Sequence, residues 1–308
     1  MRHWTVGWML AAAGAVPSEG RAADDVCASD VACDRELCID REAFVAGFAA
    51  MHASRWPAFE PSTICAVNAI LTFWETTTAV ELMVAHPRRR RRNQRPEATA
   101  WPAYVLATAL HETQGRVHPV REALCDDEAC TVRALEAAFA DGRIANRYWD
   151  PVEPGGPRYY GRGQVQLTHR DNYVKVDAAL RAEGLLASRD LVSDPDVALD
   201  LDVSVAALVL GMVRGWFRRD RGEPASLSRY LSARRLRWRP RGAYRKARRI
   251  VNGDAKRRQA GQPIGRLLSG FAQALEPHIH FVAPEGRRPA NAPAHRHRGG
   301  VSRSAPRR

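Results

Sequence analysis

The most informative segment of the sequence reads Tyr159-Tyr160-Gly161-Arg162-Gly163-Gln164-Val165-Gln166-Leu167-Thr168. Its two glycines allow backbone conformations and close approaches that other residues do not. The amide and hydroxyl groups that follow suit sugar hydroxyls and acetamido groups, and the tyrosines can form an apolar floor. The segment lacks the Lys-Ser/Thr pair of a phosphate-binding loop and the third glycine of a dinucleotide site. We therefore interpret it as a loop suited to a sugar, with a purely structural role of these side chains as the alternative.

A strongly apolar helix is predicted upstream, from about Pro102 to Thr113, with proline at the N-terminal position that helices tolerate and Gly115 as its stop. Glu112 follows eleven residues of which only His111 is readily charged. Burial and the partial negative charge at a helix C-terminus both raise a carboxyl pKa, and a protonated carboxyl can act as a general acid. The alternative is a glutamate in an ordinary salt bridge. A zinc-protease motif is excluded, because position 115 is glycine where the second histidine is needed.

A second acidic group follows about ten residues later and comprises Glu122, Asp126, Asp127 and Glu128. Gly115 and Pro119 stand before this group, so it cannot continue the helix of Glu112, and the chain must turn. Two carboxyl groups can then face each other across a groove. A separation of roughly 6.5 to 9.5 Å would leave room for a water molecule and would predict inversion at the sugar carbon.

Helical periodicity runs through most of the chain, and little alternates with the period of two typical of strands apart from residues 164–167. Apolar residues recur at helical spacing in the segments Phe44 to Met51, Ser62 to Glu75, Asp171 to Glu183, Asp202 to Phe217, Ser226 to Leu231 and Arg266 to Leu275. Residues 151–157 are rich in proline and glycine and are expected to form a loop. The pattern predicts a mainly α-helical domain over residues 61–282.

The N-terminal region is typical of an exported protein. Residues 1–23 look like a signal peptide, with a buried N-terminal helix as the alternative, and residues 24–60 form a Cys-rich segment. The six cysteines lie in the first half of the chain and are Cys27, Cys33, Cys38, Cys65, Cys125 and Cys130. Disulfides are favoured over a zinc site because no Cys-x-x-Cys pair is present, but the pairing stays open. We expect a secreted or periplasmic protein.

The net charge of +13 is concentrated in two segments. Six arginines lie from Arg88 to Arg95, within a basic linker insertion at residues 86–97, and seven lie in residues 284–308. The tail at residues 283–308 is predicted to be disordered. Both segments are either simply solvated or bind a polyanion weakly, and their lack of aromatic residues argues against stacking on single-stranded nucleic acid. A third basic cluster surrounds Trp238 and comprises Arg234, Arg235, Arg237, Arg239 and Arg241. No apolar run reaches the roughly 18 residues that span a membrane.

The order of these motifs resembles that of the family 19 glycoside hydrolases, the chitinases and related wall-lysing enzymes. The likeness covers roughly residues 60–277, and its segments are 106–113, 119–122, 159–168 with 172–173, 194–196, 211–217 and 250–253. The resemblance implies a bilobal, lysozyme-like, mainly α-helical fold with a substrate cleft and little β structure. It also implies an inverting mechanism that needs no cofactor and no metal ion, and we expect a monomer.

The resemblance also assigns roles to individual residues. Glu112 matches the family's general acid. Glu122 is our choice for the general base, with Asp126, Asp127 or Glu128 as substitutes, because that stretch varies between subgroups. Substrate contacts are expected from His111, Tyr160, Arg162, Gln166, Thr168, Asn172 and Asn252.

The expected activity is hydrolysis of β-1,4 bonds in an amino-sugar polymer, either chitin or the glycan strands of peptidoglycan. The basic segments suit a negatively charged bacterial wall and favour peptidoglycan. Two other classes stay open. One is a non-catalytic carbohydrate-binding relative that keeps the cleft but has lost the base, and the other is a basic polyanion-binding protein.

Overall fold

The computed structural model describes residues 38–56, 60–78 and 96–282, and it confirms the mainly α-helical class. The predicted signal peptide, most of the basic linker and the basic tail lie outside these residues. The helices in chain order are α1 (Arg41–Ala53), α2 (Pro61–Phe73), η2 (Trp74–Thr78), α4 (Glu97–Glu112), η4 (Glu122–Leu124), α5 (Glu128–Ala140), α6 (Arg170–Ala182), η5 (Pro195–Leu199), α7 (Leu201–Arg214), α8 (Leu227–Tyr230), α9 (Ala233–Trp238), α10 (Pro240–Ala247), η6 (Arg248–Ile250), α11 (Ile264–Leu275) and η7 (Glu276–His278). None of these helices is both long enough and apolar enough to cross a lipid bilayer.

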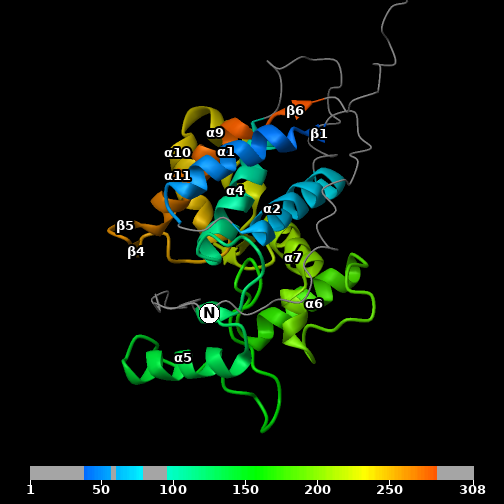
Figure 1. Ribbon diagram of the computed structural model, residues 1–308, viewed down its shortest axis with the longest axis vertical. Helices are drawn as coiled ribbons and strands as arrows, with labels where there is room; N and C mark the ends of the chain where they lie inside the picture. The colour runs from blue at the N-terminus through cyan, green and yellow to red at the C-terminus, as the bar shows by residue number, and fades with distance from the viewer. Residues whose placement is uncertain (1–37, 57–59, 79–95, 283–308) are drawn as a thin grey trace, which may run out of the picture.

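The strands of the described chain are two residues long and form antiparallel pairs. The pairs are β1 (Cys38–Ile39) with β6 (Phe281–Val282), β2 (Arg219–Asp220) with β3 (Glu223–Pro224), and β4 (Arg258–Gln259) with β5 (Gln262–Pro263). The first pair brings the two ends of the described chain together at one side of the molecule (Figure 1).

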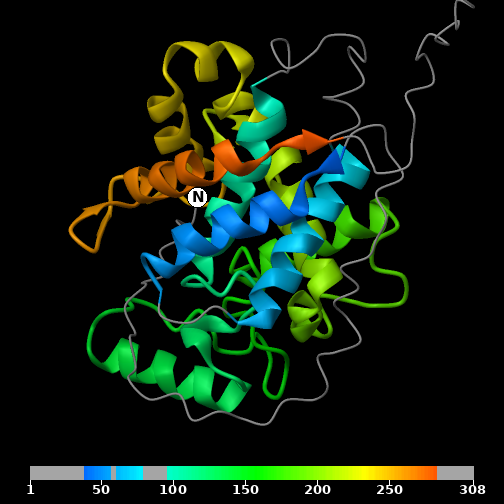
Figure 2. The ribbon, with the colours of Figure 1, turned by 45° about the horizontal axis from the view of Figure 1, so that its top comes forward.

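Helix α4 is the centre of the fold. It is apolar on every side, and Thr99 is its only residue that is not buried, as expected for a helix with neighbours all round. Figures 1 and 2 show it enclosed by α2, α7 and α11. The helix begins at Glu97, five residues before the predicted start at Pro102. An interior proline costs roughly 3 kcal/mol through its lost hydrogen bond. Burial of the first turns offsets this cost, and the Trp101 indole also donates to the Leu231 carbonyl at 2.8 Å.

The core has two parts. The large cluster surrounds α4 and includes Phe44 and Phe48 of α1, so the described end of the Cys-rich segment belongs to the same core as the helices that follow it. A small second cluster lies under α5 and consists of Leu135, Ala138, Ile144, Trp149 and Tyr160. In Figure 1, α5 lies at the far end of the molecule from α9 and α10. Tyr160, from the glycine-containing segment at residues 159–168, therefore packs in the smaller cluster.

Most predicted helices are present, with shifted ends. Helix α7 ends at Arg214 rather than Phe217, because Gly215 adopts a left-handed conformation with φ of 74° and stops it. Helices α5, α9 and α10 were not predicted. Asp127, considered as a substitute base, begins α5 as its N-cap and accepts a hydrogen bond from the Cys130 amide.

Candidate active site

Glu112 is the last residue of α4, and its side chain is 3% exposed. Its carboxylate accepts a hydrogen bond from Arg248 and forms an ion pair with it. Arg248 opens η6 directly after α10, is fully buried, and also donates from Nε to Asp254 Oδ1 at 2.6 Å. Two carboxyl groups therefore share one buried guanidinium.

Burial is the main reason why the pKa of Glu112 is raised above its ordinary value. The positive charge of Arg248 opposes this shift, and the nearby Asp254 carboxylate adds to it. One guanidinium can balance only one of the two carboxylates, so a proton on Glu112 makes the cluster electrically neutral. The neighbouring His111 is also buried, and burial lowers the pKa of its imidazole. Burial therefore acts on both neighbouring groups in the direction of the uncharged form.

Glu122 begins η4 and is 7% exposed. Its Oε1 accepts a hydrogen bond from the Tyr148 hydroxyl, and its Oε2 accepts one from the Gly161 amide at 2.8 Å. The Glu122 amide in turn donates to the Gly161 carbonyl at 2.7 Å. Ala123 and Leu124 follow with φ of 62° and 59°, a left-handed conformation that costs energy in residues with a side chain. A strained turn thus fixes this carboxylate against the glycine loop.

The pKa of Glu122 is also raised by burial, but the groups around it act in the opposite direction. Tyr148, the Gly161 amide and the charge of Arg162 all lower the pKa, because each stabilises the carboxylate. No second carboxylate contributes to its shift, in contrast to Glu112. The three other acids of this stretch, Asp126, Asp127 and Glu128, are exposed. Among these four acids, Glu122 alone is buried and held by hydrogen bonds through both oxygens.

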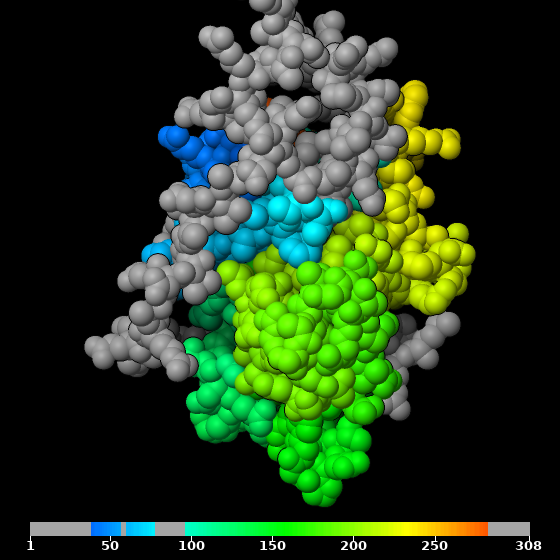
Figure 3. All heavy atoms as spheres, turned by 90° about the vertical axis from the view of Figure 1, so that its right-hand side faces the viewer, coloured from blue at the N-terminus to red at the C-terminus, as the bar shows by residue number. Residues whose placement is uncertain are grey.

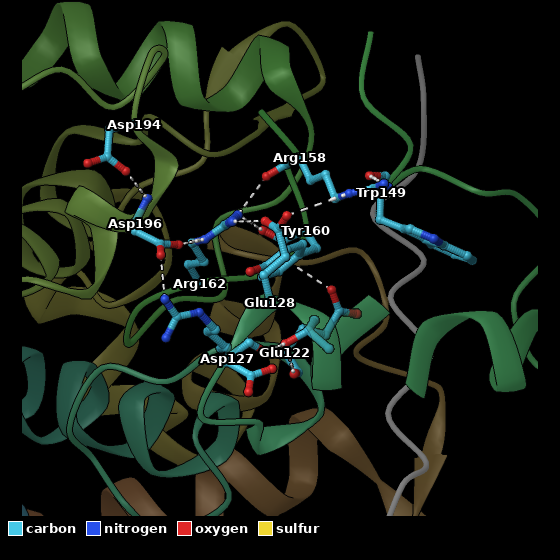
Figure 4. A network of polar contacts seen from close by, with 12 residues as sticks. Glu122, Asp127, Glu128, Trp149, Arg158, Tyr160, Arg162, Asp194 and Asp196 are labelled. Carbon is cyan, nitrogen blue, oxygen red and sulfur yellow. Dashed lines mark hydrogen bonds and ion pairs between the residues drawn. The ribbon is translucent and has the colours of Figure 1, made fainter. Parts of the chain in front are cut away.

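Arg162 lies inside the protein and holds the loop together (Figure 4). Its side chain is 2% exposed, and its guanidinium carbon lies 3.6 Å from the centre of the Tyr160 ring. It donates to Asp196 Oδ1 at 2.6 Å and to the Arg158 carbonyl at 2.8 Å, while Asp196 also pairs with Arg121. Both Arg162 and Tyr160, which were expected to contact substrate, are placed by the structure as internal supports.

The polar side chains expected to bind sugar also hold the backbone. Gln166 donates through Nε2 to the carbonyls of Val120 and Gly163, at 3.0 and 3.1 Å. The Thr168 hydroxyl donates to the Gln166 carbonyl at 2.9 Å, and Asn172 donates to the Thr168 carbonyl at 2.7 Å. These bonds fix residues 161–168 against the segment that carries Glu122.

Asn252 differs from these residues, because its side-chain amide oxygen is an unused hydrogen-bond acceptor. The residue is 5% exposed, and its Oδ1 accepts no hydrogen bond within the described chain. Its backbone amide donates to the Arg248 carbonyl at 3.0 Å, which places it beside the Glu112 cluster. A buried acceptor without a donor is costly unless a ligand supplies one.

The predicted disulfide chemistry is confirmed for Cys125 and Cys130, which form a bond that closes the turn between η4 and α5. Cys38 and Cys65 are disulfide-bonded as well. Over the described ranges, no group of three or more potential ligands is arranged to hold a metal ion.

Three residues of the site were not expected from the sequence: Tyr148, Arg248 and Asp254. The only sequence signal for the last two was their position around Asn252 in an arginine-rich, glycine-containing turn. Tyr148 lies 26 positions from Glu122, with no motif of its own. No pattern in the sequence connects the aromatic residues at 148–149 with the glycine loop, so the hydrogen bond from Tyr148 to Glu122 could not be predicted.

Fold and site together define a mainly α-helical protein with two buried, separately supported glutamates. No protein-family model matches the chain. It is structurally similar to solved family 19 chitinases. Chitinase C from Streptomyces griseus is 20% identical over 75% of this chain and 90% of that chain, with a TM-score of 0.42. A variant of chitinase C is 19% identical over 75% and 90% of the two chains, with a TM-score of 0.40. A bacterial family 19 chitinase is 22% identical over 79% and 96%, with a TM-score of 0.32.

Proposed function

We propose that the protein hydrolyses β-1,4-glycosidic bonds in an amino-sugar polymer. Glu112 donates a proton to the glycosidic oxygen, and Glu122 accepts a proton from the attacking water. The observation that carries the proposal is the contrast between the two buried carboxyl groups. Burial raises the pKa of both, and a hydrogen-bonding partner opposes the shift in each, Arg248 at Glu112 and Tyr148 with Gly161 at Glu122, but only Glu112 has a second carboxylate, Asp254, that adds to its raised pKa. Acid and base roles in one site require two carboxyl groups in different environments, and this difference in partners is what supports the assignment.

The surrounding residues support this chemistry. Arg248 fixes the position of Glu112, and its charge and hydrogen bond stabilise the carboxylate that forms once the proton has left. Tyr148 and Gly161 hold both oxygens of Glu122, and two lone-pair positions of the carboxylate stay open for a water. Asn252 offers its unpaired oxygen to an N–H or O–H group of the sugar.

The proposal is tested with Glu112→Gln and Glu122→Gln in the full chain, and Glu223→Gln on the exposed strand β3 is the matched control. Each active-site variant should lose about 10²- to 10⁴-fold in turnover, the contribution of one general acid or base. Release of reducing ends from soluble chitin oligomers and from purified cell walls is the measurement. Unchanged activity of Glu112→Gln would refute the acid assignment. A wild-type chain that binds polymer but releases no ends would identify a non-catalytic binding protein.

The same assay separates the two polymers. We favour peptidoglycan, because the basic segments of the chain suit an anionic wall. Reducing ends from chitin alone would reverse this preference. We also propose that the protein is exported, since its disulfides suit an oxidising compartment.

A further inference from the structure

A dense group of positive charges covers the two short helices α9 and α10. We define the α9–α10 patch as Arg234, Arg235, Arg237, Arg239, Arg241, Arg245 and Lys246, all of which are exposed. No acidic residue occurs between Glu223 and Asp254. None of the seven side chains forms an ion pair with a described residue. Figure 3 shows this part of the chain, in yellow, along one edge of the molecule.

The stability of the helices explains only part of the patch. Cations are favourable in the last turn of a helix and unfavourable in the first. Arg235, Arg237, Arg245 and Lys246 lie in last turns, where the helix dipole favours a positive charge, but Arg234 lies at the start of α9 and Arg241 at the start of α10, where it opposes one. Seven like charges also repel one another, so the patch is a cost to the isolated fold. A partner with negative charges would remove this cost.

The corner of the patch carries an exposed aromatic ring. Trp238, the last residue of α9, is 81% exposed, whereas the neighbouring Leu236, Ala243 and Ala247 point into the core. The patch therefore has no outward apolar stripe of the kind that inserts into a lipid surface. It also offers one ring rather than the series of rings on which single-stranded nucleic acid stacks. A single tryptophan among cations instead matches a chain of sugar rings that carry acidic groups.

We propose that the α9–α10 patch is a binding surface for an acidic polysaccharide, separate from the two glutamates. The arginines pair with carboxylate or phosphate groups along the polymer, and Trp238 packs against the face of one sugar ring. Its relation to catalysis rests on the proposed function. Helix α10 runs from the patch to Arg248, the partner of Glu112, over about 12 Å for its eight residues. A glycan substrate linked to an acidic polymer would thereby be held close to the site.

Two charge-matched variants of the full chain test the surface. Arg234, Arg235 and Arg237 are changed to Gln in one, and the exposed arginines Arg133, Arg170 and Arg221 are changed to Gln in the other. Both variants lose three positive charges, so a difference reports position rather than net charge. On immobilised polygalacturonate, the patch variant should bind at least about tenfold more weakly, and its salt slope should fall by about two. The control variant should bind within about twofold of the unaltered protein.

Trp238→Ala tests the sugar itself, since polygalacturonate and polyglutamate both carry carboxylates but only the first has rings. The variant should lose about fivefold in affinity for polygalacturonate, within the range for stacking on one ring, and nothing for polyglutamate. Equal losses in the two triple variants, or no effect of Trp238→Ala on polygalacturonate, would overturn the proposal. A patch effect confined to duplex DNA or to anionic vesicles would also overturn it. Binding is measured without hydrolysis, so a chain that binds but cleaves nothing contradicts only the proposed function.

Discussion

Gly161→Ala is the sharpest test of how Glu122 is positioned. A Cβ atom at this position would lie 2.7 Å from Gln166 Oε1 and 3.2 Å from Glu122 Oε2. Gln166 cannot simply turn away, because its Nε2 is bonded to the carbonyls of Val120 and Gly163. The methyl group must therefore break these buried hydrogen bonds or displace the Glu122 carboxylate.

The expected cost follows from these contacts. Overpacking and the loss of one or two buried hydrogen bonds together destabilise by about 2 to 4 kcal/mol. A shift of the carboxylate by a fraction of an ångström should also reduce kcat by about tenfold or more. Thermal unfolding and the reducing-end assay measure the two effects. The matched control is Gly270→Ala, at an exposed position in α11 with nothing within 4 Å of the new Cβ. It should stabilise by about 0.5 to 1 kcal/mol through helix propensity. A Gly161→Ala protein as stable and active as the unaltered chain would refute the proposed contact between the loop and Glu122.

Three further predictions concern the same site. Tyr148→Phe removes a donor to Glu122, so the pKa of that carboxyl rises and the acidic limb of the pH–activity profile should move up by about one pH unit; an unmoved limb contradicts the base assignment. Burial raises the pKa of Glu112 above its ordinary value of 4.5, so above this pH the folded protein binds more protons at Glu112 than the unfolded chain does. The free energy of unfolding therefore falls as the pH rises from 4.5 through the pKa of the folded state. Glu112→Gln should remove part of that slope in urea titrations, and an identical slope would show that Glu112 does not titrate there. Replacing Cys125 and Cys130 by Ser should lower the free energy of unfolding by about 2 kcal/mol, because the bond closes a short loop, and an unchanged melting temperature would show that the bond adds nothing.

The sequence was sufficient for the fold class and for the central helix, because burial on all sides leaves a continuous apolar run. The predicted start of α4 was wrong. We placed it at Pro102 because proline is usually tolerated only in the first turn of a helix, but here tertiary packing offsets the cost of a proline inside the helix. Helix α5 was missed because its acidic start was interpreted as a source of catalytic groups, whereas Asp127 is its N-cap. Helices α9 and α10 were missed because their apolar residues are few and their arginines dominate the pattern.

The sequence singled out the two glutamates of the candidate site, and their catalytic roles stay predictions. Glu112 and Glu122 were both selected from the sequence, and the structure buries both. The partners that distinguish them were not predictable. Arg248 lies 136 positions from Glu112, and only the packing of α10 and α11 around α4 brings it there. The roles of the loop side chains could not be predicted from the sequence either. A side-chain amide can bind either a sugar or a backbone carbonyl, and only the three-dimensional structure distinguishes the two.

Hydrogen bonds from the loop at residues 161–168 fix the conformation of the segment that connects Glu112 with Glu122. Between Glu112 and Glu122 the chain contains no helix or strand, only an isolated β-bridge from Arg121 to Arg162, and Val117 has a left-handed φ of 63°. Hydrogen bonds hold this irregular segment at several points along its length. The Val117 amide donates to the Thr113 hydroxyl at 2.7 Å, and its carbonyl accepts from Gln164 at 2.9 Å. The bonds to the carbonyl of residue 120 and between residues 122 and 161 complete the series. The loop at residues 161–168 therefore acts as a template for the segment between the acids. This accounts for its concentration of glycine and amide residues, even though most of these side chains face the protein.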